Sequence, residues 1–136
     1  IFIIILIISV AASCEWGWEE YNGKCYKLQG RTNTWTLHNF ECVYDGGALA
    51  SIHDQGENDF VRQMAGNREI YIGGASFGYN WEWADRSSFW GYSNWADSND
   101  SSPPRGRPCI VMNTYGQWEA HCCANPPRAA VCVRQW

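Results

Sequence analysis

Two short motifs carry residue types that could do covalent or metal chemistry. Residues 74–78 match the Gly-x-Ser-x-Gly pattern of a serine nucleophile, but that motif works only between a strand and a helix. The residues after it, 79–83, have no helical pattern. His121, Cys122 and Cys123 are adjacent, whereas zinc ligands are separated by short spacers so that they can converge. We therefore interpret the first motif as the start of a Gly-rich loop and the second as part of a disulfide framework, and expect no enzyme activity.

Aromatic side chains offer a non-covalent chemistry. Trp90, Tyr92 and Trp95, with the nearby Tyr115, could form a platform on which a sugar stacks or a protein partner is anchored. The stretch from residue 74 to 108 is rich in Gly, Ser, Asn and Trp and has no clear period, and residues 97–108 resemble an exposed tip. Because a loop of that length in a compact domain is usually functional or disordered, this stretch is the candidate binding region.

The seven cysteines and the start of the chain indicate an oxidising compartment. Residues 1–8 form an apolar run, and residues 9–13 are mostly small, which is typical of a signal peptide before its cleavage site. The run is shorter than the roughly 20 apolar residues that span a bilayer, so an uncleaved anchor is the less favoured alternative. We expect residues 1–13 to be a signal peptide with an incomplete start. The mature protein is then secreted and extracellular, with no membrane segment.

Residues 14–136 have room for one domain. The net charge of −4 argues against a nucleic-acid partner. Acidic residues concentrate between positions 41 and 100, and arginines between 105 and 136. This asymmetry is either the ordinary solvated surface of a small domain or a charged surface for a partner.

Local patterns predict an α+β fold. Thr34 can cap a first helix in which Trp35, His38 and Cys42 share one face and which ends at a Gly-Gly pair. A second helix is predicted over residues 55–65, with acids in its first turns. Short strands are predicted at residues 48–52, 70–73, 110–112, 116–118 and 130–133, after a loop or hairpin at residues 14–26. Two helices, short antiparallel strands and one long irregular loop make up the expected architecture.

Seven short motifs occur in an order that resembles the C-type lectin-like domain, in its long form with an additional N-terminal disulfide. The motifs are Gly23-Lys24-Cys25-Tyr26, Trp35 with Cys42 seven residues later, Gly46-Gly47-Ala48-Leu49-Ala50-Ser51-Ile52, Glu57-Asn58-Asp59-Phe60, Tyr71-Ile72-Gly73-Gly74, Trp81-Glu82-Trp83-Ala84-Asp85 and Asn94-Trp95. Each motif alone is weak, but together they are specific. The resemblance covers residues 14–132 and implies a non-catalytic recognition module. It also implies core positions for Trp81, Trp83, Trp95 and Trp118.

The resemblance further implies three disulfides. The pairs are Cys14–Cys25, Cys42–Cys132, and Cys109 with either Cys122 or Cys123. The family usually places the last of these cysteines five residues after a strand tryptophan, so Trp118 favours Cys109–Cys123. Cys122 is then left over. It is either buried and inert or the link in a disulfide-bonded oligomer.

Sugar-binding members of this family hold calcium at the tip of the loop, with oxygens from three places. Here the triplet after Asn94-Trp95 lacks its proline, Arg107 stands where an acid is expected, and Glu119-Ala120 replaces an Asn-Asp pair. We therefore expect the conventional calcium-sugar site to be absent and no cofactor to be required. The oxygens that could still hold calcium belong to Asp97, Asn99, Asp100 and Glu119.

Asn99 also begins an N-glycosylation sequon, and a glycan there would shield this region. We predict a secreted module that binds an extracellular ligand, a glycan by resemblance, through residues 86–108. The alternative is calcium-independent protein binding, self-assembly through the loop or Cys122, or a structural role. The candidate ligand-binding residues are Trp90, Tyr92, Asp97, Asn99, Asp100, Arg107, Tyr115 and Glu119.

Overall fold

The computed structural model describes residues 3–4 and 14–135. The predicted signal peptide therefore lies outside the described residues, except for Ile3 and Ile4, and stays a prediction. Within the described ranges, neither α-helix combines the length and the apolar character that crossing a bilayer requires.

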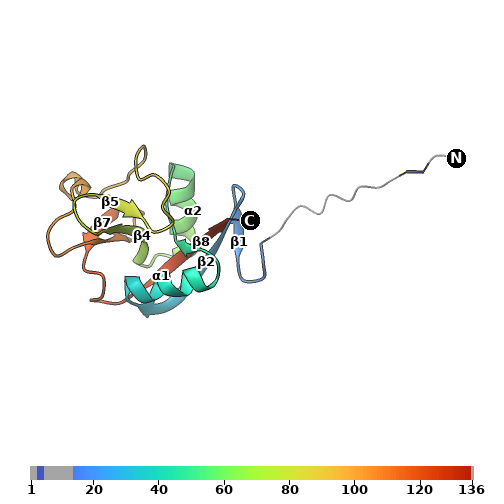
Figure 1. Ribbon diagram of the computed structural model, residues 1–136, viewed down its shortest axis with the longest axis horizontal. Helices are drawn as coiled ribbons and strands as arrows, with labels where there is room; N and C mark the ends of the chain where they lie inside the picture. Colours follow the sequence, from blue (N-terminus) through green and yellow to red (C-terminus); the bar gives the residue numbers. More distant parts are fainter. Residues whose placement is uncertain (1–2, 5–13, 136) are drawn as a thin grey trace.

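An eight-stranded sheet forms the centre of the molecule (Figure 1). Its strands are β1 (Glu19–Tyr21), β2 (Lys24–Asn33), β3 (Ala48–Leu49), β4 (Ile70–Ser76), β5 (Trp81–Trp83), β6 (Cys109–Met112), β7 (Trp118–His121) and β8 (Arg128–Gln135). The main path runs β1-β2-β8-β4-β6-β7, with β3 paired to β8 and β5 paired to β4. The pairs are antiparallel except β4 with β8, which is parallel.

Both predicted helices are present, and each begins at a capping side chain. Helix α1 (Trp35–Tyr44) is capped by Thr34, whose hydroxyl accepts the N–H of Leu37. Helix α2 (Gln55–Ala65) is capped by the Asp54 carboxylate and ends at Gly66, which adopts the left-handed conformation at φ 61°.

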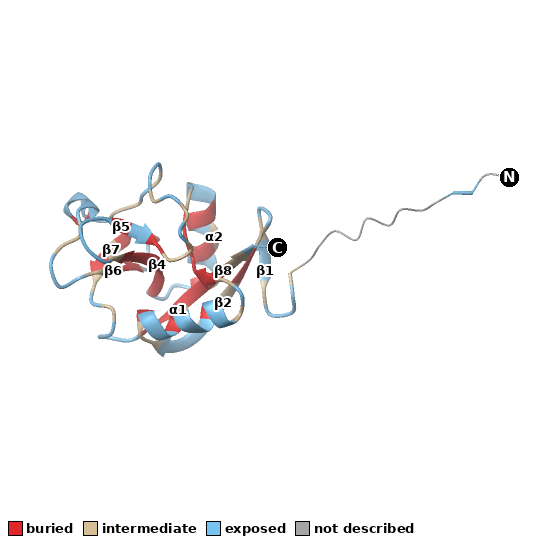
Figure 2. Cartoon of the chain, in the orientation of Figure 1, coloured by how far each residue is buried: buried red, intermediate tan, exposed pale blue. Residues whose placement is uncertain are grey.

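The two helices cover opposite faces of the sheet. Strand β8 shows this, because its successive residues point to opposite sides. On β8, Ala129, Val131 and Val133 face the core beneath α2. Ala130 and Cys132 face a second core, together with Trp35 and Cys42 of α1. Figure 2 shows this buried layer between the exposed outer surfaces of the helices.

Three disulfides are present, as the resemblance implies. They are Cys14–Cys25, Cys42–Cys132 and Cys109–Cys123. Cys122 is the free cysteine and is exposed, so the buried alternative does not hold.

Several predicted boundaries were wrong. The N-terminal segment is not confined to a small hairpin, because β2 continues to Asn33 and pairs with β8 along most of its length. Residues 74–76, expected to start the loop, are the end of β4. The next regular element is β5, not a helix, so the Gly-x-Ser-x-Gly motif lacks the strand-turn-helix context of a nucleophile.

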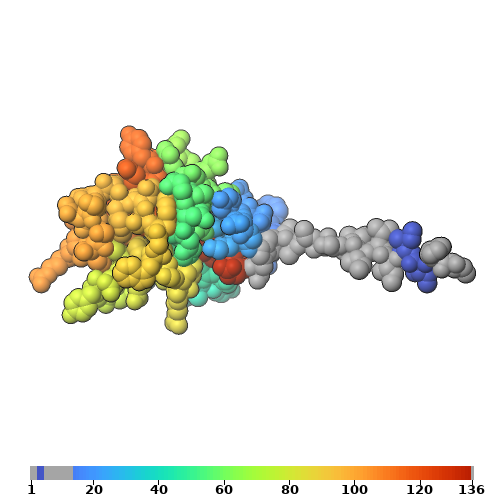
Figure 3. All heavy atoms as spheres, turned by 90° about the horizontal axis from the view of Figure 1, so that it is seen from above, coloured from blue at the N-terminus to red at the C-terminus, as the bar shows by residue number. Residues whose placement is uncertain are grey.

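The long loop therefore spans residues 77–108 and contains β5 and the short 3₁₀ helix η1 (Ser98–Ser101). Its two ends meet, since the N–H of Ser76 donates to the carbonyl of Pro108 at 2.9 Å. The space-filling view shows these yellow to orange residues gathered at one end of the molecule, away from the blue β1–β2 hairpin (Figure 3).

Candidate functional site

The long loop packs around one buried indole. Trp118 of β7 is fully buried, and the rings of Trp83, Tyr92 and Trp95 lie 5.4, 5.7 and 5.7 Å from it. Backbone hydrogen bonds reinforce the packing, because the N–H of Trp118 donates to Asn94 and the N–H of Ala96 donates to Trp118. This bonding places the base of the loop in the core.

Two cavities open in the surface of the loop. The first cavity has a volume of about 220 Å³ and is lined mainly by Trp81, Phe89, Trp90, Tyr92 and Trp95. The second cavity, about 450 Å³, shares Asn80, Trp81, Phe89 and Trp90 with the first and has a more polar lining elsewhere. The Phe89–Trp90 segment therefore contributes to both.

Of the four predicted platform aromatics, Trp90, Tyr92 and Trp95 line the first cavity together, and Tyr115 does not. Trp90 is 86% exposed and borders both cavities. Tyr92 lines the first cavity, and its hydroxyl donates to Gln55 at 2.8 Å. Burial raises the pKa of this Tyr92 hydroxyl, and the nearby acids Asp59 and Asp54 raise it further. Tyr115 is exposed in the β6–β7 turn and lines neither cavity.

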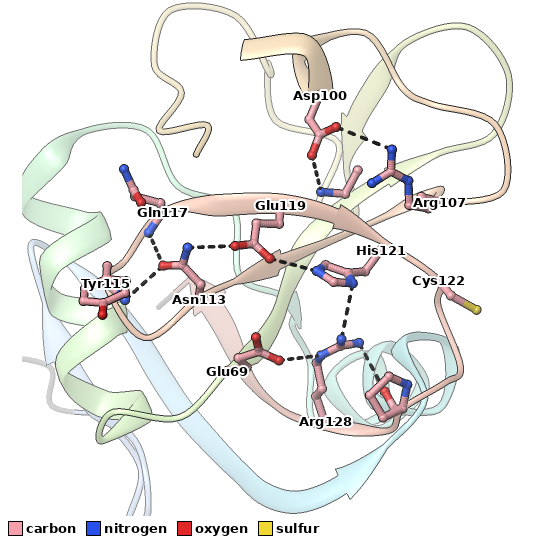
Figure 4. Close-up of polar contacts among 12 residues, drawn as sticks. Glu69, Asp100, Arg107, Asn113, Tyr115, Gln117, Glu119, His121, Cys122 and Arg128 are labelled. Atoms are coloured by element: carbon pink, nitrogen blue, oxygen red, sulfur yellow. Dashed lines mark hydrogen bonds and ion pairs between the residues drawn. The ribbon is translucent and has the colours of Figure 1, made fainter. Parts of the chain in front are cut away.

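The polar residues of the tip are bonded to the protein itself. Asp97 accepts the N–H of Asn99 at the start of η1, and both residues are exposed. Asp100 is buried, and its carboxylate accepts the N–H of Ala120 at 3.0 Å. The guanidinium of Arg107 lies 4.0 Å from the other oxygen of Asp100 (Figure 4).

Glu119 points away from η1, because alternate residues of β7 face opposite sides. Its carboxylate accepts hydrogen bonds from His121 and Asn113, each at 2.9 Å (Figure 4). These bonds, first that from His121, lower the pKa of Glu119 against the opposing effect of burial. The guanidinium of Arg128 lies 3.4 Å from the other ring nitrogen of His121.

These contacts do not fit calcium in the way that the resemblance implies. The carboxylate of Asp100 already holds the Ala120 N–H, and Arg107 places a cation beside it. Glu119 lies on the opposite side of β7 from Ala120. In the part of the chain that the structure describes, no three His, Cys, Asp or Glu side chains are grouped as metal ligands.

Cys122 lies just beyond this polar network, and Figure 4 shows its sulfur pointing away from it. Backbone N–H groups, first that of Ala124 and then that of Asn125, lower the pKa of its thiol. The carbonyl of the neighbouring Cys123 accepts the N–H of Trp35 at 2.8 Å. The thiol is therefore exposed near the start of α1.

The fold and the arrangement of disulfides agree with the family to which the chain can be compared. Residues 31–134 match the model of the Lectin C-type domain. The chain belongs to the C-type lectin family. Members of this family are recognition modules that are typically non-catalytic and bind carbohydrates or proteins.

Three relatives illustrate the similarity. The mouse low affinity immunoglobulin epsilon Fc receptor is 32% identical over 121 residues, which are 88% of this chain and 36% of the receptor. The cow C-type carbohydrate-recognition domain of CD23, solved in the presence of GlcNAc2Man3 oligosaccharide, superposes with a TM-score of 0.83 at 26% identity, covering 93% of this chain and 98% of that one. A calcium-independent type II antifreeze protein gives 0.82 at 25% identity, with coverage of 92% and 96%. This C-type lectin chain thus spans little more than a third of the curated receptor it matches.

The sequence interpretation missed several residues that line the cavities of this C-type lectin domain. Arg86 and Phe89 fall inside the predicted binding region of residues 86–108 but, like Glu82, were not named as binding residues, although all three line the second cavity. The alternation in Trp81-Glu82-Trp83 was the available signal, because it marks a strand with its tryptophans inward and Glu82 outward. No comparable signal points to Arg86, whose position depends on a turn.

Proposed function

We propose that this domain binds a glycan outside the cell through the first cavity, without a calcium ion. The observation that carries the proposal is the exposed ring of Trp90 at the mouth of an aromatic cavity. Aromatic faces stack on apolar faces of sugar rings, and such stacking needs no metal. Three disulfides support an extracellular location, because they persist in oxidising compartments.

The contacts at the loop tip support the proposed independence from calcium. Calcium prefers six to eight oxygen ligands, whereas Asp100 is committed to a backbone N–H and to Arg107. The similarity to a calcium-independent protein supports the same conclusion, since it indicates that this fold stands without the ion. Asn99 is exposed on η1 and is proposed to carry an N-glycan next to this region.

The test is glycan-array screening of the secreted, deglycosylated protein, followed by calorimetric titration of the best ligand in calcium and in EGTA. We expect the same affinity in both buffers. Replacing Trp90 by Ala should weaken binding at least about fivefold, which corresponds to about 1 kcal/mol. Phe77 is the matched control, because it is 82% exposed but lines neither cavity. Binding that disappears in EGTA, or that Trp90→Ala leaves intact, would contradict the proposal.

Self-association is a second candidate, favoured by one observation. The exposed thiol of Cys122 lies near the start of α1, and the outer side of this helix carries four exposed apolar residues. They are Leu37, Phe40, Val43 and Tyr44. An apolar helix surface of this kind is typical of a protein interface, and two copies could be linked there through Cys122.

This candidate is tested by mass under non-reducing conditions, after incubation with oxidised glutathione. We expect a disulfide-linked dimer that is absent in Cys122→Ser and that forms more slowly in Phe40→Ser. A dimer that persists in Cys122→Ser would reject the linkage. A mass increase of one glutathione instead would show that the thiol reacts but finds no second copy.

A further inference from the structure

The tip of the long loop carries a peptide bond with the chemistry of a protease substrate. Residues 102–107 read Ser-Pro-Pro-Arg-Gly-Arg. Arg105 and Gly106 are exposed, and Figure 3 shows the orange part of the loop projecting from one end of the molecule. Trypsin-like serine proteases hold the side chain before the cleaved bond in a pocket whose carboxylate selects arginine or lysine. The bond between Arg105 and Gly106 is therefore a candidate for cleavage by an enzyme of this class.

The backbone of the tip is held at two fixed points and only weakly between them. Asp100 is bonded to β5 and β7 on one side, and the carbonyl of Pro108 accepts the N–H of Ser76 on the other. Between η1 and Pro108, all of which the structure describes, one backbone hydrogen bond is present. It joins the N–H of Arg107 to the carbonyl of Pro104 at 3.3 Å, which is long for such a bond. A segment with so few contacts opens locally without unfolding the domain.

The residues before the bond already have an extended backbone, which is the shape of a peptide that binds as an added strand. Ser102 lies at φ −102° and ψ 123°. Two prolines follow it, and their rings fix φ near −65°. Only the turn around Gly106, whose φ is 76°, has to rearrange. Glycine makes that rearrangement easy, because it adopts positive and negative φ about equally well.

The other basic residues offer poorer bonds. The bond after Arg107 precedes a proline, whose nitrogen carries no hydrogen, and trypsin-like proteases do not cleave there. Arg86 is exposed, but Asp85 accepts the N–H of Ser87 at 2.9 Å and fixes the backbone on both sides of it. Arg68 donates to two backbone carbonyls. The remaining lysines and arginines lie within β2, α2 and β8, where cleavage would require a helix or the sheet to open.

We propose that the bond between Arg105 and Gly106 is a processing site for an extracellular trypsin-like serine protease that accepts proline before arginine. Hydrolysis breaks the bond between the carbonyl carbon of Arg105 and the nitrogen of Gly106 and consumes one water molecule. The water oxygen enters the new carboxylate of Arg105. Both water hydrogens pass to the nitrogen of Gly106, which becomes an ammonium group. This inference does not depend on the proposed glycan binding.

The cleaved chain should remain one folded molecule. Cys42 lies before the cut and Cys132 after it, so their disulfide joins the two pieces. Strands β6 and β8 of the second piece keep their pairing with β2, β3 and β4 of the first. The cut also lies outside the first cavity, which takes only Ser101 from this part of the loop. The change is confined to the tip, where Asp100 and Arg107, 4.0 Å apart, then belong to different pieces.

The first test is limited proteolysis of the secreted protein with trypsin and, separately, with thrombin, a trypsin-like protease that accepts proline before arginine. Mass spectrometry at early times should show a first cut after Arg105 with both enzymes. The intact mass should rise by one water, and reduction should release two pieces. A first cut elsewhere, or no cut while the protein stays folded, would overturn the site. Cleavage by trypsin but not by thrombin would overturn the proline preference, and pieces that separate without reduction would overturn the two-chain product.

The second test uses variants to ask which side chains direct the cut. Arg105→Gln should abolish cleavage at the tip by both enzymes. Pro104→Ala should slow thrombin at least about tenfold and leave trypsin nearly unchanged, because only thrombin selects the residue before arginine. Arg86→Gln is the matched control, since it removes another exposed arginine in a turn, and it should be cut at the wild-type rate. If Arg105→Gln is cut at another base at a similar rate, exposure alone directs cleavage and the inference is wrong.

The third test asks whether the folded tip is itself the substrate. A synthetic peptide of residues 100–108 gives the cleavage rate of the same bond without the fold. The folded protein should be cut within about tenfold of this rate, which corresponds to an opening free energy below about 1.4 kcal/mol. A rate several hundredfold lower that rises with the unfolded population in urea would mean that the protease attacks the unfolded chain, and the processing site would be rejected.

Discussion

The two sides of β7 differ in how completely their neighbours are partnered. On one side, the long loop covers Trp118 but leaves the ring of Trp90 exposed and the N–H of Trp83 without an acceptor. On the other side, Glu119 and His121 belong to a continuous chain of hydrogen bonds that reaches Asn113 and Arg128. A region whose polar groups satisfy one another needs no ligand, whereas the exposed ring of Trp90 is accessible to one.

Asp100 extends the same contrast to the tip of the loop. Its carboxylate holds the N–H of Ala120, and its carbonyl accepts the indole N–H of Trp81 at 2.8 Å. In sugar-binding relatives a calcium ion organises this region, by the resemblance described above. In this chain, direct hydrogen bonds join η1 to β5 and to β7 at the same place.

The largest effect is expected at the indole on which the loop packs. Trp118→Ala should lower the free energy of unfolding by about 3–5 kcal/mol, the range for large aromatic truncations in a core. Urea denaturation measures it. Trp90→Ala, at the exposed end of the same loop, should stay within about 0.5 kcal/mol of the wild type. Similar losses for both variants would contradict the distinction between a buried base and an open surface.

Asp100→Ala should have the next largest effect. The variant leaves the N–H of Ala120 buried without its acceptor, which is unfavourable by about 1–3 kcal/mol. Asp97→Ala serves as the control, because this exposed carboxylate only caps η1. If Asp100→Ala were as mild as Asp97→Ala, the tip would not depend on this bond.

The fold was more predictable than the site because helix caps and periodic patterns of apolar residues can be recognised locally in the sequence. Thr34 marks the start of α1, and α2 has the bounds that the pattern predicted. The start of β4 at Ile70 was also predicted. Its extension to Ser76 was missed, because glycines at 73 and 74 suggested a loop. They are needed where the chain packs closely, since a Cβ at Gly74 would lie 2.2 Å from Ile110.

The site was less predictable because the path of an irregular loop, which no periodic pattern describes, decides which of its residues come together. Trp90 and Tyr92 were found by residue type, and both line the first cavity beside Trp95. Tyr115 shares their residue type but lies in another turn. Asp100 and Glu119 were grouped as calcium ligands on the basis of chemistry alone, whereas the alternation of β7 separates the carboxylate of Glu119 from η1. Whether calcium binds at all stays a prediction.

A smaller effect is expected from the pH dependence of Glu119. Its pKa in the folded state lies below the ordinary value of 4.5, so its ionised form favours the fold. That contribution is present above the unfolded pKa and is lost as the pH falls through the folded pKa. The stability difference between wild type and Glu119→Gln should therefore be larger at pH 6 than at pH 3. A difference that does not change with pH would mean that the chain of hydrogen bonds does not depend on this charge.

The smallest effect, none at all, is expected from metal removal. A ligand that binds only the folded state raises its stability, so a protein without a calcium site should melt at the same temperature in calcium and in EGTA. Differential scanning fluorimetry measures both. A midpoint that rises with calcium would show that the tip residues hold the ion despite Arg107. The tip would then be a ligand site and not a region whose polar groups are already satisfied.

The hydrogen bond between Ser76 and Pro108, which closes the loop, bears on how the sequence of this domain can evolve. Because the closing contact lies within the sheet, the length of the intervening chain hardly matters to the strands. Each doubling of a flexible loop is unfavourable by only about 0.6 kcal/mol. Insertions and substitutions near the tip are therefore tolerated, and new specificities can arise there by ordinary sequence drift. The constraint lies at the base, where any replacement must still keep Trp118 from water.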